Sequence, residues 1–521
     1  MLGKRSSQGR LFATSTLLSD GQLDSLGIYG RLARESHRIF RDDDFASLYC
    51  SKNGRPSAPP SLLALATLLQ FLDGVSDAEV INRCRYDLRW KAALGLETHD
   101  LKAPFARSTF QLFRYRLILH EAEGQIFETS IRVARDAGLL PKKLRLSLDS
   151  SPVRGRGAVK DTYNLLSDAI KGVLGSIAEK EERAIAEVAE EADLARHVSA
   201  PSIKGSVEMD WSSEDERRAF LASLLADCAA VAALAKQAEC GGDELELIEQ
   251  VIRQDVDEDP DDGGGAPKIR RGVAKGRMPS VVDPEMRHGH KSSGKGYTGH
   301  KAHVAVSESG VIVDVDVTAP SQSEGSKVSE AIAASREVTG SEIDEVLGDC
   351  AYSTRNAQQE AAESDVTLTT KMPGHRRGYF APGDFTVSED GTQAQCPAGE
   401  ASDKCVRRDD GYVHQWSRKT CGACALREQC TKAKRRTLMM PPDFHERRAR
   451  ERYARSAEGR AKIRKRVGVE HAIGRLKQRG AGQARYFGRK KTRLQWMMIA
   501  AAVNLCLVFD RANDQKARKA A

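Results

Sequence analysis

The sequence predicts a mixed α/β fold, in which a central sheet is flanked by helices. Two observations carry this prediction. Between residues 141 and 375, segments with the two-residue alternation of strands are interspersed with segments of helical spacing. Helical and Cys-rich stretches precede or interrupt them. We therefore expect one sheet domain that is assembled from separate parts of the chain, with further domains around it.

Residues 1–140 are predicted to form a helical N-terminal domain. The stretch "GRPSAPPSLLALATLLQFLDGVSDAEVINRCRYDLRWKAALGL" has helical spacing of apolar residues after a Pro-rich start, and Ser76 with Glu79 makes a capping box. The later stretch "RSTFQLFRYRLILH" is an amphipathic helix. Its arginines could touch phosphates, whereas a plain core-forming helix explains the pattern equally well. These arginines are Arg107, Arg114 and Arg116.

The strands and helices of the sheet domain are predicted in the following order. "KKLRLSLDSSPV" alternates as a strand that ends at Asp149, and "GHKAHVAVSESGVIVDVDVTAP" forms a β-hairpin. A helix follows at 325–338, "EIDEVLGDCAYS" is a buried strand that ends at Asp349, and "DVTLTTKM" is one more strand. The sheet domain is expected to comprise residues 141–160, 277–375 and 445–510.

Two insertions are expected to interrupt the sheet domain. Residues 161–255 are rich in Ala, Glu, Lys and Leu with helical periodicity, and the acidic, Gly-ended linker "DVDEDPDDGGG" closes this insertion, which is expected to span residues 161–276. Residues 376–444 hold five of the eleven cysteines. Because this long chain shows no secretion signal, the cysteines argue for a metal site rather than a disulfide framework.

The Cys-rich insertion contains a candidate structural zinc site. Cys421 and Cys424 have the two-residue gap of a zinc knuckle, and Cys430 with Cys396 would complete four thiolates. A Zn²⁺ ion would stabilise the fold of this insertion, which we expect to be too small to form a hydrophobic core of its own. A reduced, metal-free cluster is the alternative. Two further residues leave the fourth ligand open, namely Cys405 and His414.

The composition is that of a globular protein with several domains, since 521 residues with 40% hydrophobic content can bury a large core. The chain contains no run of 18 or more apolar residues and no apolar signal core, so we expect a cytoplasmic protein without membrane contact. The stretch "LQWMMIAAAVNLCLVF" is apolar but short, which favours a buried helix.

The net charge of +8 is unevenly distributed. Between Glu446 and Arg493 there are 18 Lys or Arg residues against 4 Asp or Glu residues. Basic runs are often only solvated faces, but an excess of this size across a helical region favours a nucleic-acid partner.

Within this basic segment, "RVGVEHAIGRLKQRG" contains an isolated acid, Glu470. On a helix, Arg466, Glu470 and Lys477 point the same way. One interpretation is a surface helix with an ion pair from i to i+4. The other is a metal-binding carboxylate between phosphate-binding cations. Two strand-end acids, Asp149 and Asp349, favour the second, because a ribonuclease-H-like fold gathers such acids into a two-metal site.

The chain resembles the DDE transposases of bacterial insertion sequences, which have an InsH-like N-terminal domain and a ribonuclease-H-like core. The matching stretches include "FASLYCSKNGRPSAPPSLLALATLLQFLDGVSD", "SLDSSPVRGRGAVKDTYNLL", "VLGDCAYST" and "RVGVEHAIGRLKQRG". In the family signature Tyr, Arg, Glu and Lys are separated by two, three and six residues. Arg466, Glu470 and Lys477 fit this signature, whereas Ile463 stands at the Tyr position.

The resemblance implies that Asp149, Asp349 and Glu470 are catalytic and hold two Mg²⁺ or Mn²⁺ ions. It implies a homodimer that binds double-stranded DNA, both terminal inverted repeats and target DNA, in the bacterial cytoplasm and at the nucleoid. The N-terminal domain would serve in DNA binding or dimerisation. The residues expected to contact DNA are Arg466, Lys477, Arg475 and Arg114.

The expected activity is metal-dependent cleavage of DNA followed by strand transfer. Two alternatives are a two-metal nuclease of the same fold without strand transfer, and a transposase-derived DNA-binding protein without enzymatic activity. The complete set of three acids argues against the last of these.

Overall fold

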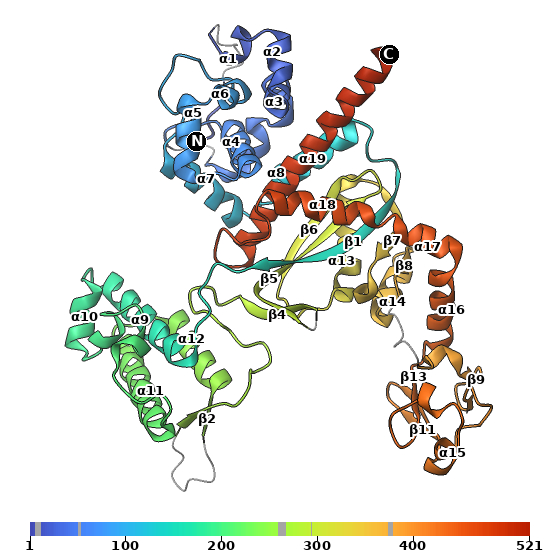
Figure 1. Ribbon diagram of the computed structural model, residues 1–521. Coiled ribbons are helices and arrows are strands. Elements are labelled where there is room, and N and C mark those ends of the chain that lie inside the picture. Colours follow the sequence, from blue (N-terminus) through green and yellow to red (C-terminus); the bar gives the residue numbers. More distant parts are fainter. Residues whose placement is uncertain (6–11, 51–53, 259–266, 293, 373–378, 521) are drawn as a thin grey trace.

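The protein has four parts (Figure 1): an N-terminal helical part in blue, a helical insertion in green, a Cys-rich insertion in orange, and a central sheet whose segments, together with their helices, range from teal to red. The computed structural model describes residues 1–5, 12–50, 54–258, 267–292, 294–372 and 379–520, with side chains of the last helix up to residue 512. The Gly-rich end of the acidic linker, 259–266, and the first residues of the Cys-rich insertion, 376–378, lie outside the described residues.

The N-terminal part is helical, as the sequence predicts. Its helices are α1 (Thr14–Leu17), α2 (Asp20–Ser25), α3 (Ile28–Ile39), η1 (Asp42–Leu48), α4 (Pro60–Asp73), α5 (Asp77–Tyr86), α6 (Leu88–Leu94), α7 (Arg107–Leu119) and α8 (Gln125–Asp136). Helix α4 is apolar on all sides and is buried along almost its whole length. Because α4 and α8 pack on the C-terminal helix α19 (Arg489–Ala520), the N-terminal helices and the sheet share one hydrophobic core.

A mixed six-stranded sheet with flanking helices forms the centre, which is the α/β core that the sequence predicts. Its strands are β1 (Lys143–Arg154), β4 (Arg287–Ser292), β5 (Lys295–Ser307), β6 (Ile312–Thr318), β7 (Glu342–Gly348) and β8 (Thr367–Thr370). The order is β4-β5-β1-β7-β8, and β6 also pairs with β5. Strands β1, β7 and β8 are parallel, whereas β5 is antiparallel to β1, β4 and β6.

Helices cover both faces of the sheet. The elements between the strands are η4 (Gly325–Lys327), α13 (Val328–Thr339), η5 (Cys350–Tyr352) and α14 (Arg355–Glu363). Helix α13 packs on β6 and β7, and α18 (Val467–Gln478) packs on β1 and β5. Successive side chains of a strand point to opposite faces, so each strand serves both helical layers.

The prediction that the first strand ends at Asp149 is wrong. Strand β1 continues to Arg154 because it pairs with β5 along this whole stretch, whereas its parallel pairing with β7 stops at Ser147. Between Ser147 and Arg154, where β1 bridges to Gln483, the β7 side of β1 has no paired strand among the described residues, and such an edge tolerates the missing N–H of Pro152. Asp149 therefore lies within a strand and not in a turn.

The helical insertion has its own hydrophobic core. Its elements are α9 (Thr162–Lys180), α10 (Ile185–Glu191), η2 (Ala195–His197), η3 (Ile203–Ser206), α11 (Glu214–Gln237), α12 (Gly242–Asp255), β2 (Val256–Glu258) and β3 (Pro267–Ile269). Helices α10, α11 and α12 all pack on α9.

The Cys-rich insertion also has a core, formed by Phe385, Ala394, Trp416, Leu438, Met440 and Phe444. The expectation that it is too small to build a core is therefore wrong. Its elements are η6 (Pro382–Asp384), β9 (Thr386–Val387), β10 (Ala394–Gln395), β11 (Lys404–Arg408), β12 (Gly411–Gln415), α15 (Arg418–Gly422), η7 (Arg427–Gln429) and β13 (Thr437–Met440). Helices α16 (Phe444–Arg455) and α17 (Ala457–Arg464) connect it to α18.

By length and composition alone, two helices within the described ranges could cross a membrane, α11 and the stretch Arg489–Ala512 of α19. In the α19 stretch 83% of the apolar window is buried inside the protein, in agreement with the predicted buried helix. In α11 the buried share is 33%.

Asn504 connects α19 to the sheet. Its side chain accepts a hydrogen bond from the Ile312 N–H (2.9 Å) and donates one to the Ile312 carbonyl (2.8 Å).

We expect Asn504→Leu to lower the free energy of unfolding by about 2–4 kcal/mol, because both backbone groups of Ile312 lose their hydrogen-bond partner inside the protein. Chemical denaturation measures this loss. Asn356→Leu, at an exposed position of α14, is the control and should change stability by less than about 0.5 kcal/mol; equal losses would contradict the assignment.

Candidate active site

Asp149 and Asp349 lie at the same level of the sheet because β1 and β7 pair in register. The last paired residues are Ser147 and Leu347, and each acid stands two residues further along its chain. In parallel strands this places both acids at the same edge of the pairing. Asp349 directly follows β7 and caps η5, where its Oδ1 accepts a hydrogen bond from the Ala351 N–H at 2.9 Å.

Helix α18 brings Glu470 to this edge. Arg466, the residue before α18, donates Nη1 to Asp149 Oδ2 at 3.2 Å and Nη2 to Glu470 Oε1 at 3.2 Å. Nη2 also lies 3.5 Å from Asp149 Oδ2. Because Nη2 of Arg466 contacts both carboxylates, the distance between Asp149 Oδ2 and Glu470 Oε1 cannot exceed the sum of its two contact distances. We call Asp149, Asp349 and Glu470 the acid triad.

The ion pair from Arg466 to Glu470 is the i to i+4 contact of a surface helix. However, the same guanidinium also holds Asp149, which lies 317 residues earlier in the chain. A surface pair would not reach into the sheet. The local interpretation of the "RVGVEHAIGRLKQRG" helix is therefore incomplete.

The electrostatics of the acid triad favour bound cations. Burial raises the pKa of Asp149, the Arg466 guanidinium and the Ser150 N–H lower it, and the carboxylates of Asp349 and Glu470 raise it again. Acids that raise one another's proton affinity also raise their affinity for other cations. The side chain of Glu470 is 56% exposed and that of Asp149 is 17% exposed, so the site opens to solvent beside Glu470.

Across the described residues, no group of three or more His, Cys, Asp or Glu side chains is arranged so that it could hold a metal ion. At the acid triad, the Arg466 guanidinium lies between two of the acids and supplies the positive charge. The side chains of the acid triad are nevertheless chemically suited to a hard divalent ion, because all three supply carboxylate oxygens.

Burial and the neighbouring Lys291 lower the pKa of Lys477, and the Asp149 carboxylate partly offsets this. Lys477 lines a cavity of about 540 Å³ beside the last residues of β1, together with Lys291, Lys295 and Arg154. Among the described residues the side chain of Lys477 has no hydrogen bond or ion pair, whereas its backbone carbonyl accepts from the Gly480 N–H. Lys291 and Lys295 are not among the predicted DNA contacts, although the two lysines of the stretch "HKSSGKGY" could have indicated them.

The other two predicted DNA contacts lie elsewhere. Arg114 is 7% exposed, donates hydrogen bonds of 2.6 Å to Asp77 and Gln70, and lies over the ring of Phe110. This placement matches the core-forming alternative for α7 and does not support a DNA contact. Arg475 lies beside Arg479 and Cys506, where burial and Arg479 lower its pKa, and not beside the acid triad.

The cysteines of the predicted zinc site line one cavity of about 30 Å³, and they are Cys396, Cys421, Cys424 and Cys430. Burial raises the pKa of Cys430, Arg436 lowers it, and the other three cysteines raise it further. The Arg436 N–H donates to Cys421 Sγ at 3.4 Å. Cys405 lies outside this cavity on β11, opposite His414.

Two family models match the chain. The transposase DDE domain matches residues 395–508, which contain Glu470 and the Cys-rich insertion from residue 395 onward, and the transposase domain DUF772 matches residues 28–116, which contain α3 to α6. No curated protein and no solved structure matches the chain. The two family matches support a DDE transposase of the insertion-sequence type.

Proposed function

We propose that this transposase binds the ends of an insertion sequence, cuts a phosphodiester bond there and joins the freed 3′ end to target DNA. The observation that carries the proposal is the approach of three acids, distant in the chain, near Lys477, whose side chain has no partner in the described part of the chain. Acids that can hold divalent ions and cations that can hold phosphates are together what phosphodiester chemistry requires. The mixed sheet and the DDE match support a ribonuclease-H-like core.

In this proposal Asp149, Asp349 and Glu470 hold two divalent ions, Mg²⁺ or Mn²⁺. Bound there, such ions would stabilise the negative charge that develops on the attacking and leaving oxygens. Aspartate from the sheet and glutamate from α18 approach the site from different elements, so the site is complete only when α18 is packed on β1.

Arg466 would have two successive partners in this proposal. In the protein alone its guanidinium neutralises Asp149 and Glu470, which would otherwise repel each other. With divalent ions held by these acids, the guanidinium would no longer be needed there and would be free to pair with a DNA phosphate. Arginine suits both roles because carboxylates and phosphates both match its planar fork of donors.

A basic surface leads away from the acid triad. On one side are Lys477, Lys291 and Lys295. On the other side, α16, α17 and the residue after α17 carry exposed basic side chains toward the Cys-rich insertion, namely Arg447, Arg452, Arg460, Arg464 and Lys465. We propose that double-stranded DNA follows this surface. Because two transposon ends must be brought together, we also propose a homodimer, acting at the bacterial nucleoid in the cytoplasm.

A nuclease of the same fold without strand transfer would use the same acids, and only its products differ. A labelled transposon end incubated with plasmid DNA should yield joined molecules if strand transfer occurs. Cut ends without joined molecules would favour the nuclease, and neither product would favour a DNA-binding protein without activity.

We expect Asp149→Asn, Asp349→Asn and Glu470→Gln each to reduce DNA cleavage by at least about a thousandfold, because one oxygen ligand of the ions is lost. DNA binding should change by less than about threefold, since the phosphate contacts remain. Gel assays with labelled transposon ends measure both quantities. Asp344→Asn, at an exposed position of β7, is the matched control and should cut normally. Loss of binding in step with cleavage would indicate a structural role for the acids.

We expect Lys477→Ala to weaken binding to all DNA sequences about equally and to reduce the slope of log affinity against log salt by roughly one, because one phosphate contact is removed. Arg466→Ala should do the same in the presence of Mg²⁺. The surface ion-pair interpretation expects a loss of only a few tenths of a kcal/mol in stability and an unchanged slope. Lys171→Ala, an exposed lysine of the helical insertion, is the control in the salt series.

We propose that Cys396, Cys421, Cys424 and Cys430 bind one structural Zn²⁺ ion, because four thiolates around one small cavity suit this ion. Elemental analysis of the purified protein should give about one zinc per chain. Cys424→Ser should lose it, whereas Cys405→Ser should retain it because Cys405 lies outside the cavity. A protein without zinc, or one in which Cys405→Ser loses zinc, would contradict this ligand set.

A further inference from the structure

The Asp149 carboxylate is held by its own strand as well as by Arg466. Its Oδ1 accepts a hydrogen bond from the N–H of the next residue, Ser150, at 2.8 Å, while its Oδ2 accepts from Arg466 Nη1 at 3.2 Å. The first of these bonds ties the carboxylate to the peptide group between Asp149 and Ser150. A rotation of this peptide group would therefore turn the carboxylate as well.

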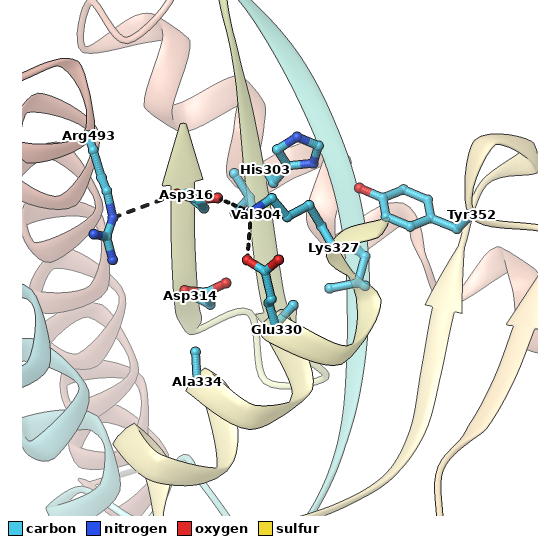
Figure 2. A pocket seen from close by; sticks show the side chains of 11 residues that line it. His303, Val304, Asp314, Asp316, Lys327, Glu330, Ala334, Tyr352 and Arg493 are labelled. Atoms are coloured by element: carbon cyan, nitrogen blue, oxygen red, sulfur yellow. Dashed lines mark hydrogen bonds and ion pairs between the residues drawn. The ribbon is translucent and has the colours of Figure 1, made fainter. Parts of the chain in front are cut away.

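Strand pairing restrains this peptide group on one side only. The pairing of β1 with β5 continues through Ser150, whereas its pairing with β7 stops at Ser147. The face of β1 opposite Asp149 also borders a cavity of about 260 Å³, which Leu148 and Tyr352 line (Figure 2). Side-chain contacts are therefore needed to fix the conformation of β1 just beyond Asp149.

The Ser150 side chain makes such a contact. Its hydroxyl donates a hydrogen bond to Glu324 Oε1 at 3.2 Å. Lys301 Nζ donates to the same oxygen at 2.9 Å and to the Gln322 carbonyl at 2.8 Å. A chain of hydrogen bonds thus leads from Lys301 through Glu324 to the hydroxyl of Ser150.

The ion pair of Lys301 and Glu324 is suited to hold a neighbouring group in place. Lys301 is 9% exposed and the Glu324 side chain is 21% exposed, so solvent screens the pair only weakly. Burial raises the pKa of Glu324, but Lys301 and the Ser150 hydroxyl lower it below its ordinary value. Glu324 is therefore ionised at neutral pH. A hydrogen bond from a hydroxyl to a carboxylate is stronger than one between neutral groups.

We propose that Glu324, held by Lys301, is a positioning residue for Asp149. Through the Ser150 hydroxyl it fixes the peptide group whose N–H holds the Asp149 carboxylate. It acts from the opposite face of the strand and does not touch the reacting groups. The inference rests on the proposed cleavage of DNA at the acid triad. Orientation matters there, because a misplacement of about 1 Å in a catalytic group can lower a rate about a hundredfold.

The test compares the full chain with its Ser150→Ala variant in a cleavage assay with labelled transposon ends, at saturating DNA and Mg²⁺. We expect the rate constant of cleavage to fall by at least about tenfold, because the carboxylate loses its fixed orientation. Affinity for the DNA end should change by less than about threefold, since no phosphate contact is removed. Glu324→Ala should behave as Ser150→Ala does.

Two further variants separate positioning from a general loss of structure. Ser150→Thr keeps the hydroxyl and suits a strand, so its rate should lie within about threefold of that of the unchanged protein. Ser329→Ala removes a comparable bond outside the site, from Ser329 Oγ to Glu360 Oε2 at 2.9 Å, and should cut normally. Equal rates for Ser150→Ala and Ser329→Ala would overturn the inference, as would a loss that Ser150→Thr does not restore.

A double variant shows whether the two residues act through one another. If Glu324 acts through Ser150, the variant with both Ser150→Ala and Glu324→Ala should cut at most about twofold more slowly than the slower single variant. Losses that multiply would mean that the two residues act independently, which contradicts the inference.

Mn²⁺ binding by the protein without DNA gives a result that does not depend on cleavage. Electron paramagnetic resonance of free Mn²⁺ should show about tenfold weaker binding by Ser150→Ala, because one carboxylate is less well oriented, and unchanged binding by Ser329→Ala. A protein that binds no Mn²⁺ and cuts no DNA would overturn the proposed function. A protein that does both, and is matched in both by Ser150→Ala, would overturn only the role of Glu324.

Discussion

The register between β1 and β7 is the constraint on which the candidate active site depends. Because Ser147 pairs with Leu347, Asp149 and Asp349 stand at equal distances beyond the last paired residues. A slip of one residue would turn Asp149 to the opposite face, where α13 packs and where it could not meet Arg466. The shared core of sheet, N-terminal helices and α19 holds this register, and Asn504 adds hydrogen bonds from α19 to β6.

The second constraint is charge balance. Three acids at one edge of a sheet repel one another, and burial of Asp149 increases the cost of its charge. Arg466 offsets this cost in the protein alone. The same side chain is suited to a phosphate, so the residue that stabilises the free protein is also a candidate to recognise its substrate.

The two insertions and the N-terminal helices are built in different ways. The helical insertion follows Asp149 in the chain and the Cys-rich insertion follows Asp349. Each insertion has a hydrophobic core of its own. The sheet therefore keeps its pairing although the chain departs from it twice. The N-terminal helices instead share their core with the sheet and α19, so they and the sheet stabilise each other.

The sequence by itself determined the order of the strands and helices of the sheet except β4, since their periods of hydrophobicity are local properties; β4 (Arg287–Ser292) is mostly polar and carries no such period. It also indicated Asp149, Asp349 and Glu470 as candidate metal ligands, because two of them follow strand-like runs and the third is an isolated acid in a basic helix. The spacing of the cysteines indicated a candidate zinc site. Only the tertiary structure decided which partners they have. The length of β1 depends on β5, the burial of Arg114 depends on Asp77, and the contact from Arg466 to Asp149 joins residues 317 positions apart. Such pairings are set by packing between distant segments, and no local pattern in the chain encodes them.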